Sequence, residues 1–425
     1  MSVAAAHFPS RSAVAGFVTE QRLALASIGL VGLHVVDDNF LQPEPGMSAV
    51  DHLPGGLGLL ALVAAAAWAY PRVRAGARAA IALLAGFLGV LAGTEAVYYT
   101  ISASPSGDDF TGFLSTVVGF VLLGVGVTTL WRTRRTDDSR GRRYARRGLE
   151  TFGAVAMAFL ILVPMAISYV VTHTARAGVP TPNLGATPEN VSFTTSDGLR
   201  LEGWFVPSRN GATVIAFPGR SGPQQHARML VSHGYGVLLF DRRGEGASEG
   251  DPNVFGWKGD RDLYAAIDYL RGRADVDPTR IGGIGLSVGG EMLIHAAAHS
   301  DSLKAIVSEG SSGQSIRDGI ANAGIVQGFL ADVGGTAGTA LFTSTLPPPS
   351  LKSEVAKIAP RAVFLIYGEH GQGGTEEKPN KGFYAAAGQP KQIWEVPNGQ
   401  HVGGIDTEPA EYERRVIGFF DRELR

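Results

Sequence analysis

The feature that most constrains this chain is the crowding of its apolar residues into blocks within the first 172 positions. Five segments there are candidate membrane spans, at 23–36, 57–70, 79–101, 110–131 and 149–171. The last three have the roughly 20 residues that a helix needs to cross the hydrocarbon core, whereas the first two need flanking residues. A cleaved secretory signal contains only one such segment. The sequence therefore predicts an all-helical transmembrane domain of about five spans over residues 1–175.

The arginines between these segments predict how the anchor is oriented. The connection 71–78 contains three arginines and the connection 132–147 contains eight, whereas the connections 37–52 and 102–109 contain no lysine or arginine. Positively charged connections stay in the cytoplasm. With five spans, the N-terminus is then cytoplasmic, and everything after residue 171 lies outside the cytoplasm. Residues 176–190, with their prolines and glycine, are typical of a linker.

Ionisable residues gather at the predicted outer ends of the spans. They are His34, Asp37, Asp38, Asp51, His52 and, within the third span, Glu95. In the hydrated interface such residues commonly cap helices, but histidines with carboxylates are also suited to metal binding or transport. Both interpretations stay open, and Glu95 is the deepest of the six.

From about residue 191 to residue 425 the pattern changes to short β-rich runs separated by helical stretches. The predicted strands are 191–196, 201–207, 213–219, 236–241, 280–286, 304–310, 362–368 and 392–397, and the predicted helices are 224–234, 260–273, 289–300 and 409–424. Alternation of this kind is typical of an α/β domain with a mostly parallel sheet.

One serine in this half, Ser287, stands in the run RIGGIGLSVGGEM among five glycines. Gly285 and Gly289 flank it at two residues on each side, directly after a predicted strand and before a predicted helix. A serine on so sharp a turn projects from the sheet edge, and its neighbours must be small because strand and helix nearly touch. A glycine-rich turn with a helix-capping serine is the structural alternative. A phosphate-binding loop is excluded because no GxxxxGK[ST] pattern follows.

A nucleophilic serine needs a base, and the base needs an orienting carboxylate. His401 follows the last predicted strand, where a loop would return over the sheet edge, and His370 on the preceding loop is a weaker competitor. The remaining histidines of this half lie on predicted helices or at their ends, where surface or packing roles are expected. They are His226, His233, His295 and His299.

The acidic partner is expected in the loop after the strand 362–368. That loop offers Glu369, Glu376 and Glu377. Glu369 ends the strand immediately, whereas the other two follow three glycines that would let the loop fold towards His401. We favour Glu376, then Glu377, with helix capping as the alternative role for both.

Two backbone amides are expected to stabilise an oxyanion. One is the amide of Val288, at the start of the helix after the nucleophile. The second should come from the PGRSG turn, which follows the strand 213–219, through Arg220 or Ser221. A plain strand-to-helix turn is the alternative for PGRSG.

Taken together, these motifs resemble the α/β-hydrolase superfamily over residues 191–425. FPGRSG stands where the family has a His-Gly loop, DRRGEGAS where it has DxRGxGxS, and GLSVG and the late His401 complete the order. The closest likeness is to membrane-anchored serine hydrolases of the BEM46 and serine-aminopeptidase-like groups. The resemblance implies an eight-stranded sheet and a triad of Ser287, a glutamate of the 369–377 region and His401.

Two positions depart from the family pattern. Pro218 replaces the usual histidine, and Gly371 stands where the family places its acidic residue. The second departure puts the acid assignment in doubt and is compatible with an impaired triad. Asp241, Arg242 and Arg243 in the DRRGEG turn are expected to be structural.

Residues 311–361 lie where such enzymes insert a cap over the substrate site. Their glycines, alanines and isolated apolar residues are typical of a mobile cover for a hydrophobic pocket, although core packing explains much of the pattern equally well. Together with an anchor beside the bilayer, this segment favours a small acyl or lipid-like substrate.

Net charge and cysteine content exclude other kinds of partner and chemistry. The formal net charge is −2, and no long basic face follows residue 150, so nucleic acid is not an expected partner. The chain has no cysteine, which excludes disulfides, thiolate metal sites and a cysteine nucleophile.

The sequence therefore predicts a membrane-anchored serine hydrolase that cleaves an ester, or else an amide or thioester, outside the cytoplasm. This chemistry requires no metal or organic cofactor. The main alternative is a catalytically impaired hydrolase fold that binds a ligand and acts as a membrane sensor. A transport or metal-dependent activity in the anchor is the third interpretation.

Overall fold

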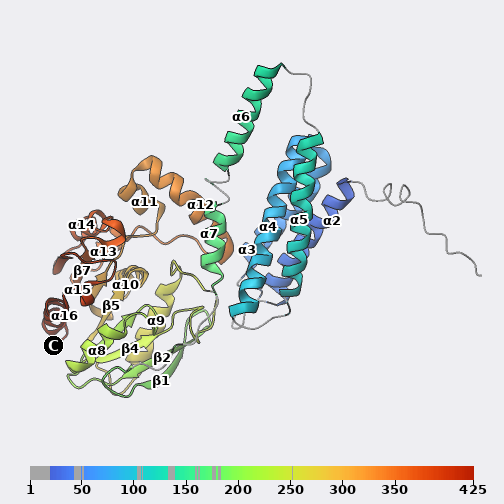
Figure 1. Cartoon of the computed structure of the whole chain (residues 1–425). Coiled ribbons are helices and arrows are strands. Elements are labelled where there is room, and N and C mark those ends of the chain that lie inside the picture. The colour runs from blue at the N-terminus through green and yellow to red at the C-terminus, as the bar shows by residue number, and fades with distance from the viewer. Residues whose placement is uncertain are drawn as a thin grey trace, which may run out of the picture. The chain divides into compact units, whose positions relative to one another are not determined.

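The structure is a computed structural model that describes residues 20–42, 49, 52–102, 107, 109–132, 139–157, 160, 163–174, 179, 183–250 and 252–425. It forms two compact units, one ending at Met157 and the other running from Ala158 to Arg425. Figure 1 shows the first unit as a group of helices and the second as a sheet with helices on its faces.

Among the described residues of the N-terminal unit, three helices are long and apolar enough to cross a membrane, over Glu20–Leu41, Ala75–Tyr98 and Asp109–Arg132. The unit contains α2 (Glu20–Val36), η1 (Asp37–Leu41), α3 (Leu53–Ala69), η2 (Tyr70–Arg72), α4 (Ala75–Ser102), α5 (Asp109–Arg132) and α6 (Arg140–Met157). Helices α4 and α5 pack closely, because a methyl group at Gly89 would lie only 2.7 Å from the carbonyl oxygen of Ser115. Small residues of this kind allow close helix packing in membranes.

The predicted count of five spans is not confirmed. The segment 57–70 lies in α3, which has 17 residues and is shorter than the three candidates. The segment 149–171 is shared between α6 and the short α7 (Val163–Thr172). Helix α7 belongs to the C-terminal unit, where the Ser168 hydroxyl donates to the carbonyl oxygen of Gly335, 2.8 Å away.

Two of the ionisable residues of the anchor join α2 to α5. The Thr111 hydroxyl donates to Asp37 Oδ2 at 2.7 Å and lies 3.1 Å from His34 Nδ1. No group of three metal-ligating side chains occurs among the residues that the structure describes. Asp51 lies outside them. The contacts of His34 and Asp37 are those of a structural hydrogen-bond network between helices.

The C-terminal unit contains an eight-stranded sheet in the order β1-β2-β4-β3-β5-β6-β7-β8. The strands are β1 (Glu189–Thr194), β2 (Arg200–Val206), β3 (Thr213–Phe217), β4 (Gly236–Phe240), β5 (Ile281–Leu286), β6 (Leu303–Glu309), β7 (Ala362–Gly368) and β8 (Lys391–Val396). Strands β1, β2 and β4 pair antiparallel, and every other pair is parallel. The predicted α/β class and mostly parallel eight-stranded sheet are confirmed.

Helices cover both faces of this sheet (Figure 1). One face carries α9 (Gly259–Arg271), α10 (Val288–His299), α13 (Leu351–Val355) and α14 (Glu377–Ala386), and the other carries α8 (Gln224–Ser232) and α16 (Pro409–Leu424). Strand β3 shows why two cores form: Ile215 and Phe217 enter the first, while Val214 and Ala216 enter the second. Successive side chains of a strand point to opposite faces, so a strand buried on both sides is apolar throughout.

The predicted cap segment contains α11 (Ile316–Ala323) and α12 (Ile325–Thr343) between β6 and α13. The short η4 (Gly371–Gly373) follows β7, and α15 (Gly404–Thr407) follows β8. The parallel strands β3 to β8 all end at the same sheet edge. The turns that follow them therefore gather the candidate site residues there.

Candidate active site

Ser287 occupies a strained turn between β5 and α10. Its backbone angles are φ 51° and ψ −122°, which side chains other than glycine rarely adopt. Its N–H donates to the carbonyl oxygen of Glu309 at the end of β6, 2.7 Å away. The turn is thus fixed to the neighbouring strand while the hydroxyl projects from the sheet edge.

The glycines on each side of Ser287 fill the role that the sequence predicts for them. A Cβ at Gly285 would lie 2.5 Å from the carbonyl oxygen of Gly289, and a Cβ at Gly289 would lie 2.4 Å from Pro218 Cδ. Both contacts involve backbone or a proline ring, which cannot move aside. Strand β5, helix α10 and the turn after β3 therefore meet too closely for side chains at these positions.

His401 lies between the predicted nucleophile and one of the predicted acids. Its Nε2 is 2.9 Å from Ser287 Oγ, and its Nδ1 contacts Oε1 of Glu376. A carboxylate can only accept, so the proton of the neutral imidazole belongs on Nδ1. Nε2 is then free to accept the proton of the Ser287 hydroxyl.

The carboxylate of Glu376 lies against Gly371, the position where the family places its acidic residue. The Glu376 side chain is fully buried, and its Oε2 accepts the N–H of Gly368 at 3.2 Å. A Cβ at Gly371 would lie 2.2 Å from that same Oε2. An aspartate at 371 would overlap this carboxylate, so the glycine makes room for an acid supplied five residues later. Because a carboxylate lies beside His401, the glycine at position 371 no longer favours an impaired triad.

The other candidates of this loop lie away from His401. Glu377 is exposed and pairs with Lys381 one helical turn on. Glu369 is exposed, and its Oε2 accepts the N–H of Asn398 at 2.8 Å. The side chain of His370 is also exposed. Glu376 is the glutamate among the three that the fold brings to His401.

The structure gives different results for the two predicted oxyanion donors. Val288 begins α10, and the first amides of a helix have no carbonyl one turn earlier to bond, so its N–H is suitably placed. The N–H of Arg220 instead donates to Asp241 Oδ1 at 2.9 Å. The Arg220 prediction is therefore wrong for this amide, because a buried carboxylate already occupies it. Ser221 is the remaining donor that we expect from this turn.

The DRRGEG turn has the structural role expected of it. Asp241 also accepts from the Arg220 guanidinium at 2.8 Å, and Arg243 donates to Asp262 at 2.7 Å. These pairs are buried. They fix the turns after β3 and β4 beside the nucleophile.

The imidazole of His401 is tuned towards the charged form. Its hydrogen bond to Glu376 raises its pKa above the ordinary value of 6.5, and partial burial opposes this only in part. The carboxylates of Glu309 and Glu291 add to the rise.

Sequence reasoning missed these last two carboxylates. Glu291, one turn after Ser287, is buried, and its Oε1 accepts the N–H groups of Ser312 and Gly313 at 3.0 and 2.9 Å. Burial raises its pKa despite those bonds. The available signal was their position: Glu291 lies two residues after the GLSVG motif, and Glu309 is the penultimate residue of the predicted strand 304–310.

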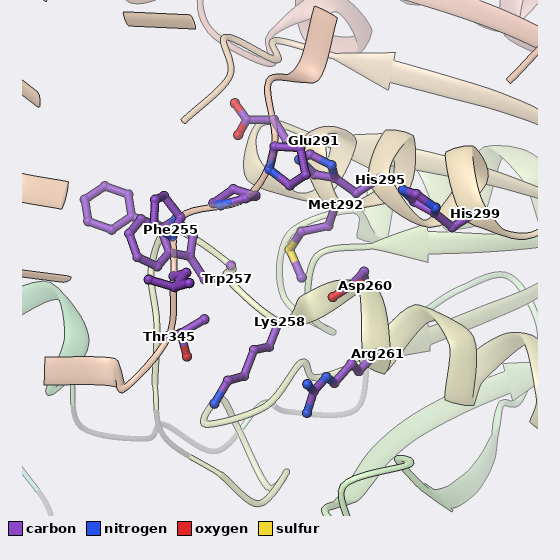
Figure 2. Close-up of a pocket in the computed structure, with 15 residues that line it drawn as sticks. Phe255, Trp257, Lys258, Asp260, Arg261, Glu291, Met292, His295, His299 and Thr345 are labelled. Atoms are coloured by element: carbon purple, nitrogen blue, oxygen red, sulfur yellow. The ribbon is translucent and has the colours of Figure 1, made fainter. Parts of the chain in front are cut away.

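A cavity of about 310 Å³ opens along α10, beginning one turn after Ser287. Figure 2 shows Met292, His295 and His299 along this helix, with Lys258 and Asp260 at the start of α9. Apolar and proline side chains form much of the remaining wall: Phe255, Trp257, Leu346, Pro347, Pro348 and Pro349. The end of the predicted cap segment thus lines a cavity next to the nucleophile turn.

Comparison with known families places most of this unit in one of them. Residues 174–405 match the X-Pro dipeptidyl-peptidase (S15) family. These residues contain every strand of the sheet and all of the candidate catalytic side chains.

Curated proteins also resemble part of this chain. The uncharacterized protein YfhR of Salmonella typhi is 31% identical over 268 residues, which cover 58% of this chain and 84% of that protein. The α/β hydrolase domain-containing protein WAV2 of Arabidopsis thaliana is 33% identical over 160 residues, covering 36% of this chain and 50% of its own.

Among solved structures, the chain is similar to the esterase Pf2001 of Pyrococcus furiosus. The identity is 24%, the TM-score is 0.49, and the match covers 60% of this chain and 98% of the esterase. An acylaminoacyl peptidase of Pyrococcus horikoshii matches with 22% identity and a TM-score of 0.43, over 56% of this chain and 42% of its own.

The contact between Glu376 and His401 leads to a prediction about pH. Neutral His401 is the form that accepts a proton, so kcat/KM for an ester should fall on the acid side with an apparent pKa above 6.5. Glu376→Gln should lower kcat about 10⁴-fold, because it no longer selects the tautomer with the proton on Nδ1. The residual kcat/KM of this variant should fall on the acid side at a lower pH than in the unchanged protein; we call this acid-side fall of the pH profile the acid limb. The exposed neighbour provides the control, since Glu377→Gln should leave both rate and pH profile unchanged. An unshifted limb in Glu376→Gln would contradict the assignment.

Proposed function

Because this chain belongs to the X-Pro dipeptidyl-peptidase (S15) family, and with it to the α/β hydrolases, we propose that it is a membrane-anchored serine hydrolase with the triad Ser287, His401 and Glu376. The observation that carries the proposal is the continuous chain of contacts from Glu376 through both imidazole nitrogens to Ser287 Oγ. Nucleophile, base and orienting acid are the parts that acyl transfer needs.

In the first half of the proposed reaction, Ser287 Oγ attacks the acyl carbon of the substrate. His401 Nε2 takes the hydroxyl proton, and Glu376 stabilises the imidazolium that forms. The amides of Val288 and Ser221 donate to the oxyanion. When the tetrahedral intermediate collapses, His401 returns the proton to the leaving group, which departs as an alcohol or amine. Ser287 then carries the acyl group.

In the second half, water takes the place of the alcohol or amine. His401 accepts a proton from water as its oxygen attacks the acyl carbon, and then returns that proton to Ser287 Oγ as the ester bond breaks. The carboxylic acid leaves and the hydroxyl is regenerated. All proton transfers pass through one nitrogen, Nε2, so the position of that nitrogen determines the rate.

We propose an ester as the primary substrate and an amide as the second candidate. The family's description favours the amide, since it names an X-Pro dipeptidyl-peptidase. The cavity along α10 favours an acyl or lipid-like chain, because aromatic, methionine and proline side chains offer it an apolar wall. Both substrates fit the same triad chemistry.

We further propose that the N-terminal helices anchor the protein in a bilayer and that residues 149–171 cross it once more, which places the hydrolase unit outside the cytoplasm. Three helices of sufficient length and hydropathy support the anchor. The eleven arginines of the connections 71–78 and 132–147 support the orientation.

Labelling with a fluorophosphonate tests the chemistry. The intact protein in membranes should bind one probe per chain and hydrolyse short p-nitrophenyl esters, and Ser287→Ala should lose both properties. An X-Pro anilide measured in parallel distinguishes the two candidate substrates. A higher kcat/KM for the anilide than for the esters would show that the primary substrate is an amide and not an ester. Absence of labelling and of turnover on all substrates would refute the hydrolase and favour a ligand-binding protein.

Filling the cavity tests the acyl substrate. Thr345→Trp places a large side chain at the cavity wall, on the segment shown in Figure 2. It should raise KM for an octanoyl ester about tenfold, since about two methylene groups worth ~0.8 kcal/mol each would lose their contacts. KM for an acetyl ester should not change. Lys352→Trp on exposed α13 surface is the control and should affect neither ester. Equal effects of Thr345→Trp on both esters would argue against the cavity.

The absence of cysteine allows a clean test of orientation. A single cysteine at exposed Lys381 should react with a membrane-impermeant maleimide on intact cells, while one at exposed Tyr144 should react only after the membrane is opened. The reverse pattern would invert the proposed topology.

A further inference from the structure

Glu309 contacts both the turn that contains Ser287 and the segment that follows His401. It is the last residue of β6 and is 1% exposed. Its carbonyl oxygen accepts the N–H of Ser287 at 2.7 Å, and its carboxylate Oε1 accepts the N–H of Gly404 at 2.9 Å. One residue thus holds both the nucleophile turn and the segment that follows His401.

The carboxylate of Glu309 is kept in its charged form by the helices on either side. The Tyr412 hydroxyl of α16 donates to Oε2 at 2.6 Å, and His226 Nε2 of α8 lies 3.7 Å from the same oxygen. Burial alone would raise the pKa of Glu309, but His226, Tyr412 and the Gly404 amide hold it below the ordinary value. A buried carboxylate with this many donors is a stable anchor point.

The segment that Glu309 holds contains a strained residue. Val402, directly after His401, has φ 49°, and a β-branched side chain is strongly disfavoured in that region. Such a conformation persists only where surrounding contacts impose it. On one side of Val402, Glu376 holds the imidazole, and on the other side Glu309 holds Gly404.

We propose that Glu309 is a positioning residue for His401, which it keeps in reach of Ser287 by fixing the strained turn at Val402 through the amide of Gly404. This inference rests on the proposed function, because it assigns a role within the same reaction. Glu309 does not touch the reacting atoms. It acts on the rate by limiting the arrangements that His401 adopts relative to Ser287.

The charge of Glu309 gives this role a second, measurable consequence. Three carboxylates raise the pKa of His401: Glu376 by its hydrogen bond and its charge, then Glu309 and Glu291 by charge alone. Neutralising Glu309 removes one of these contributions. The acid limb of kcat/KM should therefore move to lower pH, which a purely structural defect would not cause.

The test compares variants of the full-length protein in membranes, with a short p-nitrophenyl ester and a fluorophosphonate. Glu309→Gln should lower kcat and the labelling rate about 10²-fold, the cost of a small misplacement of a catalytic group. KM should stay within twofold, and the acid limb should shift to lower pH. Tyr412→Phe, which keeps the charge and the Gly404 bond, should lose less activity and keep the limb in place. The control is Glu354→Gln on α13, which changes a carboxylate that is also 1% exposed and pairs with Lys357. It should retain both kcat and the pH at which kcat/KM falls.

A rescue experiment separates positioning from folding. Glycine adopts a φ of 49° without strain. Adding Val402→Gly to the Glu309→Gln variant should therefore raise its kcat at least threefold. A wild-type rate in Glu309→Gln would overturn the inference. So would a loss of kcat in which the acid side of the kcat/KM profile does not move and Val402→Gly restores no activity. These results differ from failure of the proposed function, in which the wild-type protein itself shows neither turnover nor labelling and both proposals fall.

Discussion

The close approach of β5 and α10 is the constraint on which the rest of the site depends. Because Gly285 and Gly289 have no side chains, the strand and the helix meet almost in contact, and the residue between them is forced to a positive φ. That conformation directs the Ser287 hydroxyl away from the core and leaves the Val288 amide at the open end of a helix. The positions of the proposed nucleophile and of one proposed oxyanion donor thus follow from a single packing contact.

The other partners are brought to this point by the parallel sheet. Strands β6, β7 and β8 lie in order beside β5, so the turns that follow them deliver Glu309, Glu376 and His401 to one edge. Two buried carboxylates then act on the imidazole from different strands. Glu376 selects the tautomer, and we infer that Glu309 fixes the backbone on the far side of Val402. The site is rigid because each of its parts is bonded to a neighbouring strand.

The strands could be predicted, and Ser287 and His401 could be proposed as nucleophile and base, because their signals are local. Runs such as TVIAF and AVFLIYG are apolar at nearly every position, as strands buried on both faces must be. Ser287 directly follows such a run, and His401 lies in the loop after the last predicted strand. Glu376 could be ranked ahead of Glu377 but not chosen with certainty from sequence, because the choice depends on how a loop with three glycines closes. The occupied amide of Arg220 was hidden for a similar reason: its partner Asp241 lies 21 residues away. The fifth predicted span is not confirmed, because hydropathy alone does not distinguish lipid from an apolar partner such as α12, against which α7 packs.

The packing of α7 on α12 changes where the hydrolase half of the chain begins. A Cβ at Gly338 would lie 2.8 Å from Ser168 Cβ, so the two helices are in direct contact. A fragment cut at residue 176, in the linker, would lose α7 and expose the glycine-lined side of α12 to water. The smallest self-sufficient fragment therefore starts near Ala158. It retains the outward-facing Ile167 and Val170, and will need detergent to stay dispersed.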